Sequence, residues 1–227
     1  CELEQNHPEY GSPDSPTQRV GSGIAEGFAT VTHLQKMFSL DNTYTFEELN
    51  DWDERVRKGL RADEKAEYVV ELKIDGVSAN LIYEKARLRI GATRGDGEEG
   101  EDVTANIKTI RAIPLRLMGN DTPGLIEIRG EVYMDKRDFQ LCNKERESGG
   151  EALFANPRNV ASGSLKLLDS ALVSRRRLHF FAHSLGSHKD DTLKTQWEYL
   201  QRLKQWGVRV NPHSKLCKTM DEIKAYC

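Results

Sequence analysis

Residues 70–75 alternate strictly between apolar and charged side chains, and this pattern constrains the fold more than any other feature of the chain. The apolar members are Val70, Leu72 and Ile74, which alternate with Glu71, Lys73 and Asp75. A period of two is typical of a half-buried β-strand, on which side chains two residues apart share a face. We therefore predict a strand over 68–75 with the lysine and both carboxylates on one face.

Apolar periodicity and turn residues predict the other elements. Strands are expected over 78–84, 87–94, 125–134 and 178–185, with a turn at 84–86. Helices are expected over 46–60, 101–110, 136–147, 157–168, 192–206 and 221–226, the first of them opened by a capping-box pattern at Thr45 and Glu48. Because strands and helices mix without regular alternation, the predicted fold class is α+β with largely antiparallel sheets.

Composition excludes some functions and leaves others open. The formal net charge is −3, so any surface that binds nucleic acid must be a local patch. The cysteines lack a Cys-x-x-Cys pair, which favours reduced structural thiols at Cys1, Cys142, Cys217 and Cys227. No apolar run approaches a membrane span and no secretory leader opens the chain, so we expect a cytoplasmic protein without a membrane partner.

Lys73 has two interpretations. A lysine between two carboxylates on a strand face can be a solvated ion-pair ladder. However, Lys-x-Asp-Gly after a strand is the signature of nucleotidyltransferases that attach AMP or GMP to a lysine. The chain resembles the bacterial NAD-dependent DNA ligases from about His7 to its end, in residues 12–21, 39–42, Glu71-Leu72-Lys73-Ile74-Asp75-Gly76, Ala92-Thr93-Arg94-Gly95-Asp96-Gly97, Arg129-Gly130-Glu131-Val132 and Phe154-Ala155-Asn156-Pro157-Arg158-Asn159.

The resemblance implies the nucleotidyltransferase domain of the covalent ligase superfamily, which is related to ATP-grasp proteins and has antiparallel sheets flanking a nucleotide cleft. It places residues 1–30 in the remnant of a helical domain that recognises nicotinamide mononucleotide (NMN), with a connector, and residues 31–227 in the adenylation domain. The family continues past Tyr226 with two lysine-containing motifs, so we expect a domain truncated at its C-terminal end. Such a fragment should keep an adenosine pocket but self-adenylate poorly, and normal turnover by this chain alone would contradict that expectation.

In the family, the lysine that matches Lys73 carries AMP through a phosphoramidate bond, so Lys73 is the predicted nucleophile. Only a neutral amine attacks phosphorus, and near pH 7.4 about one free lysine in a thousand is neutral. Nearby carboxylates lower that fraction, so Glu71 and Asp75 are given other roles. We predict that Glu71 recognises adenosine, that Asp75 contacts the ribose or a metal-bound water, and that Gly76 lets the chain turn closely beside the nucleotide.

The predicted strand 125–134 repeats the pattern of the first one. Its apolar side chains should face the core, while Glu127, Arg129 and Glu131 should line a cleft. The alternative is an exposed sheet face with an Arg–Glu pair. The resemblance places Glu131 at the nucleotide, where a carboxylate accepts hydrogen bonds from ribose hydroxyls or helps to hold magnesium. No other metal ligand is assigned.

Arg94, Ser39 and Leu40 complete the predicted nucleotide site. The Asp96-Gly97 sequence after Arg94, followed by acidic residues, is usually a solvated turn. Beside a lysine–nucleotide site, Arg94 is instead a candidate for charge-assisted bonds to ribose or phosphate, and the family match assigns the arginine at this position to NAD binding. Ser39 and Leu40 resemble the segment that contributes adenine contacts, and the alternative is a plain loop before a helix.

Basic residues after residue 150 are the candidates for nucleic-acid contacts. Arg158 joins small residues at the start of a predicted helix, which suits a phosphate of DNA or of NAD. Lys166 stands where relatives often have arginine, so charge is kept but bidentate geometry is lost. The run 175–177 is either a solvated basic turn or a DNA phosphate contact. His33, His179 and His183 have no ligand spacing, so core or surface roles are expected for them.

The resemblance implies a DNA ligase that uses NAD⁺ and magnesium and acts on nicked duplex DNA, and we expect a monomer. Two alternatives stay open. The first is a lysine nucleotidyltransferase that uses ATP or GTP, such as an RNA ligase or a capping enzyme, and cofactor preference would decide. The second is a non-catalytic module, derived from a ligase, that binds a nucleotide or a protein.

Overall fold

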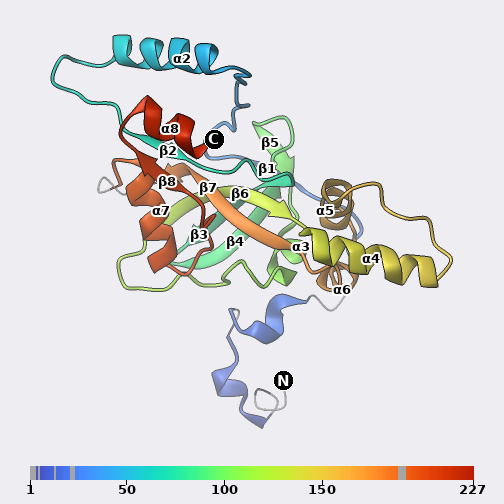
Figure 1. Ribbon diagram of the computed structural model, residues 1–227. Helices are drawn as coiled ribbons and strands as arrows, with labels where there is room; N and C mark the ends of the chain where they lie inside the picture. The colour runs from blue at the N-terminus through green and yellow to red at the C-terminus, as the bar shows by residue number, and fades with distance from the viewer. Residues whose placement is uncertain (1–3, 5, 13, 21–23, 189–192) are drawn as a thin grey trace.

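The core of the protein is a four-stranded antiparallel sheet in the order β4-β3-β6-β7. The computed structural model describes residues 4, 6–12, 14–20, 24–188 and 193–227. The four strands are β3 Val77–Glu84, β4 Arg87–Thr93, β6 Leu125–Tyr133 and β7 His179–His188. Figure 1 shows them at the centre of the molecule with helices around them.

Local sequence explains how the central sheet forms. β3 and β4 make a hairpin in which Lys85 and Ala86 both have positive φ, 49° and 63°, as the two-residue turns that match strand twist require. β3 also pairs with β6 along its whole length. Alternation along these strands puts Leu81, Ile126 and Ile128 on one face, where all three are fully buried. That face is the main hydrophobic core.

Helices cover the central sheet and connect its strands. α3 Thr104–Thr109 contacts β4, α5 Pro157–Leu165 contacts β3 and β6, and α7 Gln196–Gln205 contacts β7. α4 Lys136–Ser148 and α6 Ser170–Ser174 pack on α5. The side chain of Asn156 accepts a hydrogen bond from the main-chain N–H of Asn159 and so fixes where α5 begins. Two 3₁₀ turns, η1 Pro8–Tyr10 and η2 Pro16–Arg19, precede the sheet.

Two small sheets and a second apolar cluster lie outside this core. β1 Thr30–Thr32 pairs with β5 Glu99–Glu101, and β2 Tyr68–Val70 pairs with β8 Lys215–Cys217, both antiparallel. Figure 1 shows α2 Phe46–Gly59 and α8 Met220–Tyr226 on the side of the molecule where β2 and β8 lie. The buried members of the second cluster are Tyr68, Cys217 and Ile223. This cluster holds α2 beside the chain that leads to Lys73.

The predicted strand 68–75 is wrong beyond Val70. The residues that follow have no regular structure, and Leu72 is 48% exposed next to an exposed Lys73, so the alternation does not sort them between core and solvent. The physical reason is the length of the partner: β8 offers a register of only three residues, and beyond it the described chain has no strand for these residues to pair with. The alternation of apolar and charged residues therefore does not predict the secondary structure of residues 71–75.

The other predicted elements agree with the structure within a few residues, with one more correction. The expected helix 101–110 is shorter at its start, because Glu99–Glu101 pairs with β1 and α3 begins at Thr104. The expected start of the helix at residue 192 lies outside the described residues. The fold class is confirmed, since every strand pair in the three sheets is antiparallel. Within the described residues no helix is both long and apolar enough to cross a membrane.

A buried carboxylate attaches α2 to β2. Asp53 accepts hydrogen bonds from Arg57 Nε at 2.8 Å and from the Tyr68 hydroxyl. The bond from Arg57 is the main cause that lowers the pKa of Asp53 below its ordinary value of 3.8. Burial first, and then the bond to Asp53, raise the pKa of Tyr68 to about 12. Asp53 is therefore bound in its ionised form.

We expect Asp53→Asn to lower the free energy of unfolding by about 1 kcal/mol at neutral pH, because two charge-assisted bonds are weakened. A carboxyl with a lowered folded-state pKa contributes stability above its unfolded-state pKa and loses it as the pH falls. The difference between wild type and variant should thus be full at pH 6 and shrink as the pH falls below 3.8. Urea unfolding at pH 6 and at a pH below 3.8 measures this difference in unfolding free energy. The exposed Asp51→Asn on the same helix is the control. A difference that stays constant with pH would contradict this role.

Candidate nucleotide-binding site

Lys73 lies exposed in the irregular loop between β2 and β3. Gly76 closes this loop against β6: a Cβ at Gly76 would come 2.3 Å from the main-chain oxygen of Val132 and 2.9 Å from Cγ of Glu131. A side chain other than hydrogen does not fit there without movement of β6. The Lys-x-Asp-Gly sequence therefore holds the loop that carries Lys73 beside Glu131.

Arg158 reaches this loop from a distant part of the sequence. Its Nη1 donates to Oδ1 of Asp75 at 3.1 Å, and the two residues are 83 positions apart. Arg158 is the second residue of α5, which contacts β3 and β6. The two side chains are 58% and 74% exposed, so the pair is screened by water and adds little to stability. Such a pair leaves both groups accessible to a phosphate or a metal ion.

The carboxylate of Glu71 is held in one orientation by two donors. Gln196 Nε2 donates to its Oε2 at 3.1 Å, and Ser214 Oγ donates to its Oε1 at 3.1 Å. Gln196 also donates to the main-chain oxygen of His183 at 2.6 Å, which fixes the amide on β7. Sequence analysis missed Gln196 and Ser214, because neither lies in a motif and both reach Glu71 only through the fold.

Glu131 lies on β6 with its side chain 13% exposed. Its Oε2 accepts from Ser78 Oγ at 3.0 Å and lies 3.8 Å from His183 Nε2. Ser78 is paired with Glu131 across β3 and β6, so both side chains project from the same face of the sheet. The carboxylate has further lone pairs for a ribose hydroxyl or a cation.

The prediction that Glu127, Arg129 and Glu131 line one open cleft is wrong for the first two. Glu127 is fully buried and Arg129 is 7% exposed, and their side chains pair at 3.1 Å. The segment 33–37 covers them on this face of the sheet. Only the Glu131 end of this face stays open, beside the Lys73 loop.

Among the described residues, no side-chain hydrogen bond or ion pair joins Arg94, Ser39 or Leu40 to the Lys73 loop. All three are exposed. The Arg94 main chain is fixed, since its carbonyl oxygen accepts from Gly97 N at 3.0 Å in a tight turn. In that turn, hydrogen bonds from the main-chain N–H groups of Glu99 and Glu98 lower the pKa of Asp96. The roles of Arg94, Ser39 and Leu40 stay predictions.

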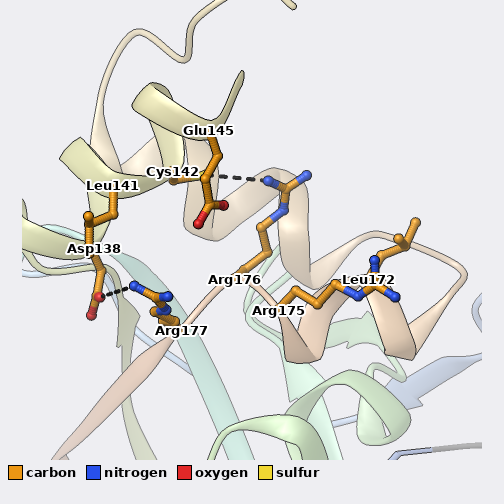
Figure 2. Close-up of a pocket in the computed structure, with 8 residues that line it drawn as sticks. All are labelled: Asp138, Leu141, Cys142, Glu145, Leu172, Arg175, Arg176 and Arg177. Atoms are coloured by element: carbon orange, nitrogen blue, oxygen red, sulfur yellow. Dashed lines mark hydrogen bonds and ion pairs between the residues drawn. The ribbon is translucent and has the colours of Figure 1, made fainter. Parts of the chain in front are cut away.

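Three of the remaining basic candidates, Lys166, Arg176 and Arg177, have partners within the protein. Lys166, at the C-terminal end of α5, pairs with Glu101 Oε2 at 2.6 Å in a largely exposed ion pair. A pocket of about 200 Å³ lies between α4 and α6. Figure 2 shows the residues that line it, among them Arg175, Arg176 and Arg177. Arg176 donates to Cys142 Sγ at 3.3 Å, and Arg177 lies 3.6 Å from a carboxylate oxygen of α4. None of the predicted nucleotide residues lines this pocket.

The charged side chains at the Lys73 loop are of the kinds that bind a phosphate group and magnesium. Lys73 and Arg158 are exposed cations, which suit phosphates. Asp75 and Glu131 offer carboxylate oxygens, which are the ligands that Mg²⁺ prefers.

Comparison with known proteins identifies the family of this chain. A family model described as the NAD-dependent DNA ligase adenylation domain matches residues 25–227. The DNA ligase of Thermotoga neapolitana is 55% identical over 225 residues, which cover 99% of this chain and 32% of the relative. The DNA ligase of Gloeobacter violaceus is 46% identical over 226 residues, which cover 100% of this chain and 33% of the relative. The chain thus spans about a third of the length of these curated relatives.

The antiparallel α+β architecture and the exposed lysine loop are consistent with a nucleotidyltransferase-type domain. The chain belongs to the NAD-dependent DNA ligase adenylation domain family. Its relatives come from bacteria and are DNA ligases, so neither an RNA ligase or capping enzyme nor a non-catalytic module is favoured.

Proposed function

We propose that this domain catalyses the first step of nick sealing, in which a lysine takes AMP from NAD⁺. The neutral amine of Lys73 attacks the α-phosphorus of the AMP half. A nitrogen–phosphorus bond forms, the bond from phosphorus to the bridging oxygen breaks, NMN leaves, and the amine loses a proton to solvent. The observation that supports this most directly is the close approach of Gly76 to β6, which holds the exposed loop that carries Lys73 against this strand. Family membership supports NAD⁺ as the donor.

Residues around the loop are assigned by their chemistry. Glu71, oriented by Gln196 and Ser214, recognises adenosine, and Glu131 contacts the ribose. Arg94 binds ribose or phosphate, while Ser39 and Leu40 contact the adenine. Asp75 and Glu131 would hold magnesium, which when bound offsets negative charge on the phosphates.

We propose the two later steps of nick sealing for a full-length ligase, because the curated relatives are about three times as long as this chain. AMP passes from Lys73 to the 5′-phosphate of nicked duplex DNA, and the 3′-hydroxyl then displaces it. Arg158 is proposed to bind a phosphate of NAD⁺ in the first step and a phosphate of DNA in the later ones, and Lys166 is a second proposed DNA contact. Each is in an exposed ion pair that a phosphate can replace. We further propose a monomer that works in the cytoplasm, with a cleft and ATP-grasp relationship as in the superfamily, residues 31–227 as the adenylation domain and residues 1–30 as connector and helical remnant.

Sealing of a nicked duplex tests this function. The chain replaces the matching segment of the Thermotoga neapolitana ligase, and this chimera is called the extended protein below. With magnesium and NAD⁺ we expect sealed product, and with ATP none. Sealing that needs ATP would move the protein to the ATP-using ligases, and a folded protein that seals with neither would leave a binding module.

Arg158→Ala should slow AMP transfer to Lys73 by about 100-fold, the usual effect of removing one preorganised donor from a developing charge. The loss should appear in kcat for adenylation, measured by the rate at which NMN is released by the extended protein. Arg175→Ala, which removes an exposed arginine elsewhere on the domain, is the matched control. Equal rates for the two variants would contradict a role for Arg158 at the phosphate.

Gln196→Ala should weaken NAD⁺ binding about fivefold, which is the effect of about 1 kcal/mol from one lost hydrogen bond. Glu71 would lose one of its two donors and sample other orientations. The measured quantity is the KM for NAD⁺ in the extended protein. Gln205→Ala, at the exposed end of the same helix, controls for helix effects, and an unchanged KM in Gln196→Ala would rule the positioning role out.

A further inference from the structure

Glu127 and Arg129 form a buried charged pair on the same face of β6 as Glu131. The two side chains are 0% and 9% exposed, and Arg129 Nη2 lies 3.1 Å from Glu127 Oε2. Burying two charges costs free energy that their attraction repays only when further hydrogen bonds satisfy both groups. The other partners of this pair therefore show what it holds in place.

Both members of the pair bind the main chain of one short segment, residues 34–36. Arg129 donates to the carbonyl oxygen of Gln35, and at 3.1 Å to that of Lys36. Glu127 accepts from the main-chain N–H of Leu34 at 3.1 Å. Three consecutive residues with no strand or helix of their own are thus fixed to the sheet by side chains. The segment leads directly to the predicted adenine contacts, which begin three positions later at Ser39.

The network also reaches the backbone of Arg94. The amide of Asn80, which is fully buried, donates to Glu127 Oε1 at 2.6 Å and to His33 Nδ1 at 3.0 Å. Because Nδ1 accepts, His33 carries its hydrogen on Nε2, which donates to the carbonyl oxygen of Arg94 at 3.1 Å. A second hydrogen bond joins segment 33–37 to the turn after Arg94: the main-chain N–H of Met37 donates to the carbonyl oxygen of Gly97 at 2.8 Å.

We propose that the Glu127–Arg129 pair, with Asn80 and His33, is a positioning device for the adenosine half of NAD⁺. It sets the path of segment 33–37, and so of Ser39 and Leu40, and it ties that path to the backbone of Arg94. This inference rests on the proposed function. None of the four side chains needs to touch the nucleotide, because they act through the main chain of residues that do.

A purely structural role would lower stability without a specific effect on the nucleotide. The chain offers a matched comparison in Arg19, whose guanidinium donates to the main-chain oxygens of Lys108, Ile110 and Ile113 at 3.0–3.1 Å. Arg129 and Arg19 both pin a segment through its carbonyl oxygens, but only the segment held by Arg129 leads to the predicted adenine contacts. Arg→Lys at each position removes bidentate geometry and keeps the charge.

The test measures the KM for NAD⁺, kcat for NMN release, AMP affinity by calorimetry and urea unfolding for Arg129→Lys and Arg19→Lys in the extended protein. Only the conformation of segment 33–40 that can bind the nucleotide contributes to affinity. If a variant lowers the population of this conformation, the apparent dissociation constant rises by the same factor. Arg129→Lys should raise the KM for NAD⁺ and the AMP dissociation constant by about 10-fold, with kcat within about threefold. Arg19→Lys should leave the KM within about twofold at a similar loss of stability.

An unchanged KM in folded Arg129→Lys, or equal rises in both variants, would overturn the proposal. If Arg129→Lys does not fold, His33→Ala carries the test: it removes only the bond to Arg94 O and the one from Asn80, and its KM must rise by about threefold or more. A wild-type protein that binds AMP but takes no AMP from NAD⁺ refutes the proposed function alone, and the AMP affinities of the variants still decide the positioning role. Failure of the wild type to bind AMP refutes both.

Discussion

Lys73→Ala is expected to abolish the transfer of AMP to this domain, a loss of at least about 10⁴-fold that places the rate below detection. The reason is chemical: the nitrogen–phosphorus bond needs an amine, and the loop between β2 and β3 offers no other lysine. Alanine removes the nucleophile without disturbing packing, because Lys73 is exposed. The measurement is the release of NMN from NAD⁺ by the extended protein.

Two further variants make this result specific. Lys73→Arg keeps a cation on the loop but removes the nucleophile, since a guanidinium stays protonated, so it should be as inactive as alanine. Lys58→Ala, on the exposed face of α2, controls for the loss of one lysine and should keep the wild-type rate. NMN release by Lys73→Ala at more than about one hundredth of the wild-type rate would show that another residue carries AMP.

Gly76→Ala should have the second-largest effect. The new Cβ would lie 2.3 Å from Val132 O and 3.0 Å from Cβ of Tyr133, so either β6 or the loop must move. Overpacking of this kind costs about 1–3 kcal/mol of unfolding free energy. Because the loop is the less constrained partner, Lys73 moves with it, and a displacement of about 1 Å can slow a reaction by about 100-fold.

The measurements are kcat for AMP transfer and urea unfolding of the extended protein. Gly59→Ala is the control, since a Cβ at Gly59, the last residue of α2, meets nothing within 4 Å. That change should leave kcat alone and add slightly to stability, because alanine favours helix over glycine. If Gly76→Ala adenylates at the wild-type rate, the close approach of the loop to β6 has no catalytic role.

Most of the central sheet could be predicted from sequence because its strands carry strong local signals. Apolar runs bounded by turn residues marked β3, β4 and β6, and the short connection at Lys85 and Ala86 marked the hairpin. The segment 71–75 had an equally strong alternation and failed. Strand formation depends on a partner, and the partner β8 is short and far away in the sequence. The length of a distant partner strand cannot be predicted from the alternation of residues within the segment itself.

The candidate site shows the same division between local and distant information. The Lys73 loop was found from a motif, and the contact of Gly76 with β6 explains physically why the motif needs a glycine. Two other features could not be predicted from the sequence: the hydrogen bond by which Gln196 orients Glu71, and the covering of Glu127 by segment 33–37. Both depend on residues more than 90 positions away from their partners, on segments without a motif of their own.

Intact mass followed by peptide mapping tests the central claim most directly. The extended protein is incubated with magnesium and NAD⁺, or with magnesium and ATP, and the site of any AMP adduct is located by tandem mass spectrometry. We expect one AMP per molecule from NAD⁺ alone, attached to the peptide that contains Lys73 and absent from Lys73→Ala. An adduct on another lysine, an adduct formed only from ATP, or no adduct in a folded protein would contradict the assignment.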